Sequence, residues 1–282
     1  KVFSGRQGIK MYVNLEDLNM KKSTVMMLIA VILSVIAISS GIVFFSQMAD
    51  ENKAEQTYEN LSSLVSSEVE HEEDIIIEGD AEVEHEYNGP TSYEKYLPIY
   101  EQNDDFIAWV KIDGTKIDYP VMQTVNNEYY LDHNYNQQYD KNGSIFLDKE
   151  CDITNPCTNM IIYGHHMKSG KMFGNLHLYS NKSYYEQHPI IQFDTIYEEG
   201  KYQIMYVFRS RIYNEDEIVF KYYQFFEAST PEEFDSHMNE MANLSIYDTG
   251  VRATYGDKLI TLSTCDNSEQ DGRFVVVAKK IN

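Results

Sequence analysis

Two patterns of hydrophobic and polar residues divide the chain into parts of different kinds. Residues 24–45 form one uncharged, apolar run, which is long enough to cross about 30 Å of hydrocarbon as a helix. After residue 105 the apolar residues come in short segments, many of them alternating with polar residues as in half-buried β-strands. The pattern predicts one transmembrane helix followed by a mostly β domain.

Short segments of this second part have the composition of strands, with turn signals between them. They are residues 106–112, 117–123, 143–148, 159–163, 190–193, 201–211, 218–226, 259–265 and 273–278. Pro120 has no backbone N–H, so we expect part of its segment at a sheet edge. Many short strands with few helices are typical of an antiparallel barrel or sandwich.

Two helices are expected among these strands. Residues 93–101 predict a short helical piece that Pro98 interrupts. The second helix follows Thr230, which suits an N-cap, with Pro231 at the first helical position and Glu233 completing a capping box. Its apolar stripe is expected to pack on the sheet and consists of Phe234, Met238 and Met241.

Charges on either side of the apolar run predict how it crosses a membrane. The pair Lys21-Lys22 precedes the run and the pair Asp50-Glu51 follows it. The positive-inside rule therefore leaves the N-terminus in the cytoplasm and everything after residue 46 outside. The run is longer than the apolar part of a cleaved signal peptide, and no clear small-x-small site closes it, which favours a signal anchor.

The chain is therefore expected to have four parts: a cytoplasmic segment, a signal anchor, an acidic extracellular linker and a folded domain, at residues 1–22, 23–46, 47–90 and 91–282. Met20-Lys-Lys reads as a natural start, so residues 1–19 are expected to be an upstream extension or a cloning remnant. Helical spacing of Ala54, Tyr58, Leu61 and Val65 predicts that the linker first continues the membrane helix as a stalk. The rest reads as a charged, extended spacer, and nothing before residue 91 is expected to contribute to the core.

The net charge of −22 is concentrated in the linker. Residues 47–90 hold 14 acidic residues and one lysine, which accounts for more than half of it. A nucleic-acid-binding protein needs clustered lysine and arginine to replace counterions, so the composition excludes a nucleic-acid partner.

Candidate chemistry lies at the ends of predicted strands. Cys265 ends one strand, Gly272 marks a turn, and the next strand begins at Arg273, so a hairpin sets positions 265 and 273 opposite one another. His165 follows the strand that ends at Tyr163. A thiol becomes a nucleophile beside a basic neighbour; histidine supplies this and can protonate a leaving amine, and arginine can stabilise an oxyanion. The three residue types suffice for acyl transfer from a peptide carbonyl.

Motifs around these residues resemble those of sortases, the cysteine transpeptidases of Gram-positive cell surfaces. Thr261-Leu-Ser-Thr-Cys265 is similar to the TLxTC signature, Tyr163-Gly-His165 to the catalytic histidine motif, and Arg273 to the family's arginine. The resemblance covers residues 93–281. Segments similar to class B sortases in particular are Asp118-Tyr-Pro-Val-Met-Gln123, Asn127-Glu-Tyr-Tyr-Leu131 and Gly143-Ser-Ile-Phe-Leu-Asp148.

The resemblance implies an eight-stranded sortase barrel with an N-terminal helical piece and an inserted helix, working without a metal or cofactor. It implies that Cys265 is the nucleophile, His165 the general acid/base and Arg273 the clamp for oxyanion and substrate. Positions that line the sorting-signal groove of class B match Asn127, Leu131 and Ser263. The implied partners are surface proteins with a C-terminal sorting signal, an amine of a cell-wall precursor or peptidoglycan and, through the N-terminal helix, the membrane.

Other polar residues near the motifs have less favoured interpretations. His166 is less suited than His165 as a base, because the family uses the histidine directly after glycine. Asp266 as an orienting partner of His165 is disfavoured because the residue after the nucleophile commonly points away. A zinc site from Cys151, Cys157 and the two histidines lacks zinc-ligand spacing. For Cys151 and Cys157, a disulfide and two free thiols stay equally open.

Three functions remain open on the sequence. The first is a membrane-anchored transpeptidase that holds its cargo as a thioester on Cys265. The second uses the same site with water or a pilin lysine as acceptor, as a hydrolytic endopeptidase or a pilin-polymerising enzyme. The third is a non-catalytic extracellular domain, which is disfavoured because a structural cysteine needs neither His165 nor Arg273 near it. The sorting motif, the acceptor amine and the cargo are not encoded in any recognisable pattern.

Overall fold

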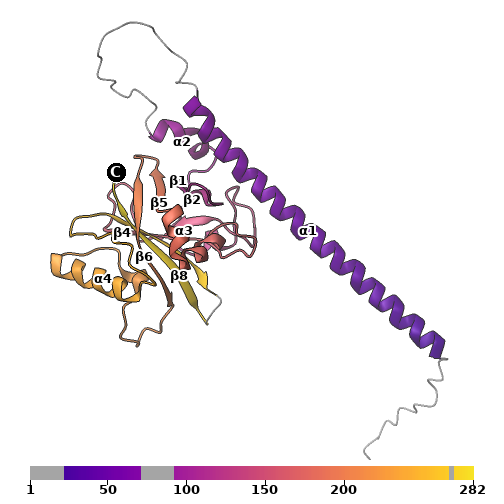
Figure 1. The fold of residues 1–282 in the computed structure, drawn as a ribbon. Coiled ribbons are helices and arrows are strands. Elements are labelled where there is room, and N and C mark those ends of the chain that lie inside the picture. The colour runs from indigo at the N-terminus through magenta and orange to yellow at the C-terminus, as the bar shows by residue number, and fades with distance from the viewer. Residues whose placement is uncertain (1–21, 71–91, 267–269) are drawn as a thin grey trace, which may run out of the picture. The chain divides into compact units, whose positions relative to one another are not determined.

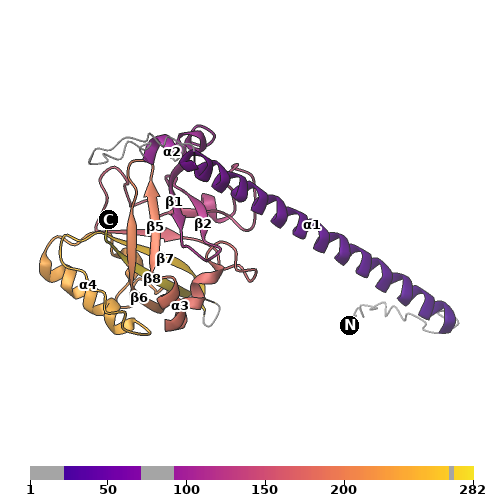
Figure 2. The same cartoon turned by 45° about the horizontal axis from the view of Figure 1, so that its top comes forward.

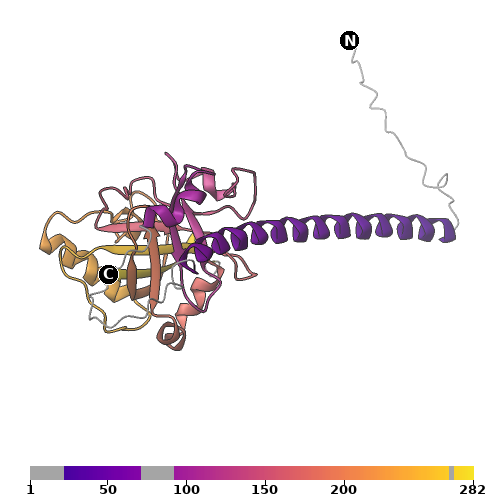
Figure 3. The same cartoon turned by 90° about the horizontal axis from the view of Figure 1, so that it is seen from above.

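The computed structural model describes residues 22–70, 92–266 and 270–282. Helix α1 (Lys22–Glu70) begins this part of the chain as one unbroken helix (Figure 3). Its segment Thr24–Ser46 has a mean hydropathy of 2.7 and is long and apolar enough to cross a membrane. Residues 1–21 of the expected N-terminal segment, residues 71–90 of the expected linker and residue 91 lie outside the described residues.

Eight strands of the second part close into a barrel (Figures 1 and 2). They are β1 (Phe106–Lys111), β2 (Asp118–Met122), β3 (Ile145–Leu147), β4 (Asn159–Tyr163), β5 (Ile190–Thr195), β6 (Lys201–Arg211), β7 (Leu259–Asp266) and β8 (Gly272–Lys280). Their order around the barrel is β1-β2-β3-β4-β7-β8-β6-β5. The pairs β2–β3 and β4–β7 are parallel and the other pairs are antiparallel. The predicted mostly β, eight-stranded barrel is confirmed.

Two predictions about strands are wrong. Residues 218–226 form no strand but contain the 3₁₀ turn η4 (Tyr222–Gln224), because Tyr222 and Phe225 are used to fill the cluster between the barrel and the helix that follows. Pro120 lies in β2, which has β1 and β3 as neighbours in the closed barrel, and is therefore not at a sheet edge. It faces Trp109 of β1, and the ladder from β2 to β3 uses only the two residues after it, so no bond to β3 needs a proline N–H.

Helix α4 (Pro231–Leu244) forms as its capping signals predict. The Thr230 hydroxyl accepts the Glu233 N–H at 3.2 Å, and the Glu233 carboxylate accepts the Ser229 N–H at 2.7 Å. The predicted apolar stripe is buried in one cluster with residues of β6 and β8, beside which α4 lies in Figure 2.

Shorter helical pieces complete the domain. Helix α2 (Ser92–Tyr100) runs through Pro98, where the sequence predicts an interruption. Three pieces between strands escaped prediction, because each is a turn or two of mixed polar and aromatic residues without a period: η2 (Tyr129–Leu131), η3 (Gly174–Ser180) and α3 (Lys182–Gln187).

The C-terminal part of α1 contributes to the folded domain, contrary to the expectation for residues before 91. From Gln56 onward the helix belongs to the same compact unit as the barrel. Tyr58 and Leu61 are buried. The Tyr58 ring packs edge-on against Tyr119 of β2, with ring centroids 5.3 Å apart. The helical spacing predicts a stalk, but it cannot show the contact with the barrel, because Tyr119 lies far from Tyr58 in the sequence.

We expect Leu61→Ala to lower the free energy of unfolding by about 2 to 4 kcal/mol, because it leaves a cavity at a fully packed position. Leu61 is 4 % exposed, whereas Leu64 of the same helix is 42 % exposed, so Leu64→Ala is the matched control and should cost much less. Urea unfolding of a chain that starts at residue 47 measures both. Equally small losses for the two variants would show that the helix end does not stabilise the domain.

Candidate active site

The β7–β8 hairpin sets Cys265 directly opposite Arg273, as the sequence predicts. Cys265 is partly exposed, so its sulfur can be reached by a substrate. One terminal guanidinium nitrogen of Arg273 donates to the main-chain oxygens of Gly272, at 2.9 Å, and Asp271, at 3.2 Å. Among the described contacts only this nitrogen is used, so the remaining N–H groups are available as donors to a ligand.

Strand β4 brings His165 to the same end of the barrel. It runs parallel to β7, and Tyr163 pairs with Ser263 where the ladder ends. The Gly164 N–H then donates to the Ser263 carbonyl at 3.2 Å, which continues the pairing by one step. His165 therefore leaves the sheet level with Cys265, although the two lie a hundred positions apart in the sequence.

All six residues that the sequence assigns to the site line one cleft of about 270 Å³. They are Cys265, His165, Arg273, Asn127, Leu131 and Ser263. Phe146, Tyr163, Ile212 and Tyr223 also line it, so a thiol, an imidazole and a guanidinium lie among apolar and aromatic side chains, as is usual for a ligand site. The individual roles of the six stay predictions.

Ser263 is the least accessible of the six. It is 1 % exposed, and its hydroxyl shares a hydrogen bond of 2.7 Å with the hydroxyl of Tyr222. This pairing favours support of the cleft wall over direct contact with a substrate. It also gives the 3₁₀ turn η4 a place in the site.

A main-chain carbonyl orients the ring of His165. Its Nε2 lies 2.6 Å from the carbonyl oxygen of Leu131. A carbonyl oxygen only accepts hydrogen bonds, so Nε2 carries a hydrogen, and Nδ1 is the nitrogen that can exchange a proton with a thiol or an amine. Leu131 thus contributes its main chain to the histidine as well as its side chain to the cleft.

Gly143 allows this carbonyl to lie where it does. Its φ of 58° is in the left-handed region, and a Cβ at this position would lie 2.6 Å from the Leu131 oxygen, a distance that real Cβ contacts do not reach. The next residue, Ser144, donates its N–H to the Tyr130 carbonyl at 2.9 Å. The glycine therefore allows the residues before β3 to pack against Tyr130 and Leu131, whose carbonyl orients His165.

The alternative members of the site have other contacts. Asp266 accepts a hydrogen bond from Arg209 Nε at 2.8 Å. His166 is not among the described residues that line the cleft, and its ring centroid lies 5.2 Å from that of His177. Burial, and secondarily His177, lowers the pKa of His166, which favours a neutral ring at pH 7 and not an ion pair with a thiolate.

Cys151 and Cys157 are buried free thiols in the connection between β3 and β4. The Cys157 thiol donates to the carbonyl of Asn159 at 3.2 Å. The neighbouring Cys157, together with burial, raises the pKa of Cys151, so this thiol stays protonated and unreactive. Within the described part of the chain, no group of three or more His, Cys, Asp or Glu side chains could hold a metal ion.

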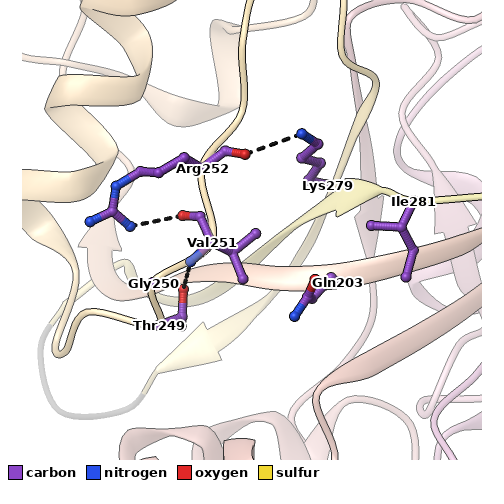
Figure 4. Close-up of a pocket in the computed structure, with 7 residues that line it drawn as sticks. All are labelled: Gln203, Thr249, Gly250, Val251, Arg252, Lys279 and Ile281. Carbon is purple, nitrogen blue, oxygen red and sulfur yellow. Dashed lines mark hydrogen bonds between the residues drawn. The ribbon is translucent and has the colours of Figure 1, made fainter.

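A second surface hollow, of about 430 Å³, lacks such chemistry (Figure 4). It is lined by residues 249–252 and by side chains at the ends of β6 and β8. Its cations already have partners, since Arg252 pairs with Asp248 at 2.9 Å and Lys279 with Asp257 at 2.8 Å. Nothing in this hollow competes with the cysteine cleft as a reaction site.

Comparisons with known proteins identify the family of this chain. The sortase domain family matches residues 110–281. The chain belongs to the sortase family. Sortase B of Staphylococcus aureus is 34 % identical over 181 residues, which are 64 % of this chain and 71 % of that protein. The chain is thus a sortase-type cysteine transpeptidase, as its motifs predict.

Solved sortase structures have the same fold. A Staphylococcus aureus sortase B–substrate complex has a TM-score of 0.69 at 26 % identity and covers 83 % of this chain and 98 % of its own. A sortase B complexed with triglycine also has a TM-score of 0.69 at 26 % identity, and covers 82 % of this chain and 99 % of its own. The class B resemblance drawn from the motifs is confirmed.

Sequence reasoning missed a residue that holds part of this sortase cleft together. Asp148 follows β3 and accepts hydrogen bonds from Tyr163 at 2.9 Å and Asn127 at 3.0 Å. Its only signal in the sequence was its place at the end of a class B motif. The two contacts join segments that the sequence separates, so the motif alone could not show them.

Proposed function

We propose that this enzyme cleaves a C-terminal sorting signal of surface proteins, forms a thioester on Cys265 and transfers the cargo to a cell-wall amine. The observation that carries the proposal is the single cleft in which the barrel register brings Cys265, His165 and Arg273 to one end. A thiol, a proton carrier and an oxyanion donor are the groups that acyl transfer from a peptide requires. A binding domain with a structural cysteine would need no such cleft.

In the acylation step, Nδ1 of His165 takes the proton of the Cys265 thiol, and the thiolate attacks the carbonyl carbon of the threonine in the sorting signal. The π electrons of that carbonyl move to its oxygen, and the Arg273 guanidinium donates hydrogen bonds to the oxyanion. When the carbonyl re-forms, the C–N bond breaks and His165 gives its Nδ1 proton to the departing amine. The products are a thioester on Cys265 and a released C-terminal fragment.

In the transfer step, an acceptor amine attacks the thioester carbon and His165 takes a proton from it at Nδ1. Collapse of the second oxyanion expels the Cys265 thiolate, to which His165 returns the proton, and leaves a new amide bond. Atoms and charges balance across the two steps without a cofactor. Water in the place of the amine would give a carboxylic acid, which is the hydrolytic alternative.

The relatives and α1 support the proposed partners and location. Sortase B structures with a substrate and with triglycine support a sorting-signal peptide as donor and a cell-wall precursor or peptidoglycan amine as acceptor. The apolar segment Thr24–Ser46 supports a single-pass membrane anchor. Lysines precede this segment and acidic residues follow it. By the positive-inside rule we therefore assign the N-terminus to the cytoplasm and the catalytic domain to the cell exterior.

Incubating the full-length enzyme in detergent with an NPxTN-like or an LPxTG-like peptide and triglycine tests this function. Mass spectrometry should find the N-terminal peptide fragment on Cys265 before triglycine is added and on triglycine afterwards. A parallel reaction replaces triglycine with a lysine side-chain amine. A transfer product in that reaction alone would favour pilin polymerisation, and a free acid alone would favour a hydrolase. Failure to cleave either peptide, with Cys265 still reactive, would contradict the proposal.

Arg273→Lys should lower kcat for peptide cleavage by about 10²- to 10³-fold, which is the usual cost of losing one well-placed oxyanion donor. Lysine keeps the charge but replaces a planar, multi-donor group with one mobile ammonium. Reaction of Cys265 with iodoacetamide should change far less, because no oxyanion forms in it. Arg209→Lys is the matched control outside the cleft.

The same variant can contradict the assignment in two ways. An Arg273→Lys enzyme with normal turnover would remove the arginine from the mechanism. A variant that also loses iodoacetamide reactivity would move the role of the arginine from the oxyanion to the thiolate.

A further inference from the structure

Asp148 is a buried carboxylate beside the cleft, and three donors surround it. It is 4 % exposed. One carboxylate oxygen accepts the Asn127 amide at 3.0 Å and the Tyr163 hydroxyl at 2.9 Å, and the other accepts the Glu150 N–H at 2.9 Å. Burying a carboxylate is costly unless its oxygens are hydrogen-bonded, so this arrangement is built and specific.

The main chain at Asp148 is held as firmly as its side chain. Its N–H donates to the Ile161 carbonyl of β4 at 2.8 Å. Its own carbonyl accepts the Gln123 side-chain amide at 2.9 Å, and the same amide nitrogen reaches the Cys151 carbonyl at 2.7 Å. The carboxylate is therefore fixed relative to the barrel strands that carry the cleft.

The partners of Asn127 determine which way its amide points. Its side-chain oxygen accepts the Lys149 N–H at 2.8 Å, and its nitrogen donates to Asp148. The Lys149 N–H only donates and the Asp148 carboxylate only accepts, so the amide cannot be turned over without losing both bonds. With these contacts made, one N–H of Asn127 remains, and Asn127 lines the cleft.

We propose that Asp148 is a positioning residue that fixes Asn127 as a hydrogen-bond donor, and not an acceptor, toward the bound peptide. The inference rests on the proposed function, because it assigns the ligand of that N–H to the sorting signal. A donor selects a carbonyl oxygen, which every extended peptide presents. Tyr163, the other partner of Asp148, also lines the cleft, so one buried carboxylate orients two side chains of the same wall.

Asp148→Asn should weaken this arrangement whichever way the new amide settles. With its NH₂ group toward Glu150 it meets the Glu150 N–H, and turned over it meets the amide nitrogen of Asn127. One donor faces another donor in either case. We expect KM for the sorting-signal peptide to rise about 10-fold, because the peptide loses a well-placed hydrogen bond from Asn127, with kcat within about 2-fold of the wild type.

Exchanging the two residues separates positioning from plain structural support. In a chain with both Asn127→Asp and Asp148→Asn, the aspartate accepts from the asparagine and from the Lys149 N–H, and the asparagine oxygen accepts the Glu150 N–H. The second amide N–H of the asparagine donates to the Tyr163 hydroxyl, which in the wild type donates to Asp148. Every described side-chain bond of the pair then has a substitute, so the unfolding temperature should return toward that of the wild type. The cleft has nevertheless lost its donor, so KM should stay raised by about 10-fold.

Full-length enzyme in detergent is used for all variants, with the NPxTN-like and LPxTG-like peptides as substrates. Asp152→Asn is the matched control: it makes the same charge change in the same loop, at an exposed residue that bonds to Thr154, and should leave KM unchanged. Iodoacetamide labelling of Cys265 checks that the thiol is unaffected. If Asp148→Asn does not fold, the exchanged pair carries the test.

The outcomes separate this inference from the proposed function. Raised KM in both the single variant and the exchanged pair, with stability recovered only in the pair, supports the role of Asp148. An unchanged KM in Asp148→Asn, or a wild-type KM in the exchanged pair, overturns it while leaving the transpeptidase intact. A wild-type enzyme that cleaves neither peptide overturns the proposed function and this inference with it.

Discussion

Cys265→Ala is expected to abolish peptide cleavage and transfer, by at least about 10⁴-fold, while leaving the fold intact. In the proposed mechanism the thioester forms on this sulfur, and losing the nucleophile of a catalytic group removes nearly all of its rate enhancement. Cys265 is partly exposed at the end of β7, so removing one sulfur atom disturbs little packing. Cleavage of a fluorogenic sorting-signal peptide and the unfolding temperature measure the two effects.

The other two cysteines supply the control for this prediction. Cys151→Ala and Cys157→Ala also remove one thiol each, from buried positions outside the cleft. We expect them to lower stability through the cavity they create, and to keep cleavage near the wild-type rate. If Cys265→Ala still cleaves the peptide, or if Cys157→Ala does not, the assignment of Cys265 as the nucleophile is wrong.

The placement of the candidate reacting groups could be predicted from the sequence as far as it depends on local patterns. Alternation along residues 259–265 and a turn signal before Arg273 are enough to specify a hairpin, and the hairpin alone sets Cys265 opposite Arg273. His165 needed more: its place at the end of a strand was local, but its nearness to Cys265 depends on the parallel pairing of β4 with β7. Only the motif resemblance assigned His165 to the same site as Cys265.

The supporting residues could not be predicted, because their partners lie far away along the chain. Residues 218–226 have strand composition, yet their aromatic side chains are used to fill the space under α4, and tertiary packing overrides a weak β preference. Tyr58 belongs to a run with helical spacing, and only the folded barrel shows that its ring packs against Tyr119. Asp148 is one carboxylate among many until Asn127 and Tyr163 are placed beside it.

His165→Ala should lower kcat by about 10³-fold or more, because the enzyme then lacks the group that accepts and returns the proton in both steps. The Leu131 carbonyl holds Nε2, so the missing function is the proton at Nδ1. Reaction of Cys265 with iodoacetamide should slow as well, since the thiol loses the neighbour that favours its thiolate. This second loss distinguishes the histidine from Arg273, whose substitution leaves alkylation nearly unchanged.

His166→Ala is the matched control, because it removes the same ring from the next position. His166 does not line the cleft among the described residues, and its lowered pKa keeps it neutral at pH 7. We therefore expect only a mild loss of kcat and unchanged alkylation of Cys265.

Nitrogen-15 NMR of the wild type should find a hydrogen on Nε2 of His165. A larger loss in His166→Ala than in His165→Ala would reverse the assignment of the general acid/base, and a neutral His165 with its hydrogen on Nδ1 would refute the orienting role of the Leu131 carbonyl.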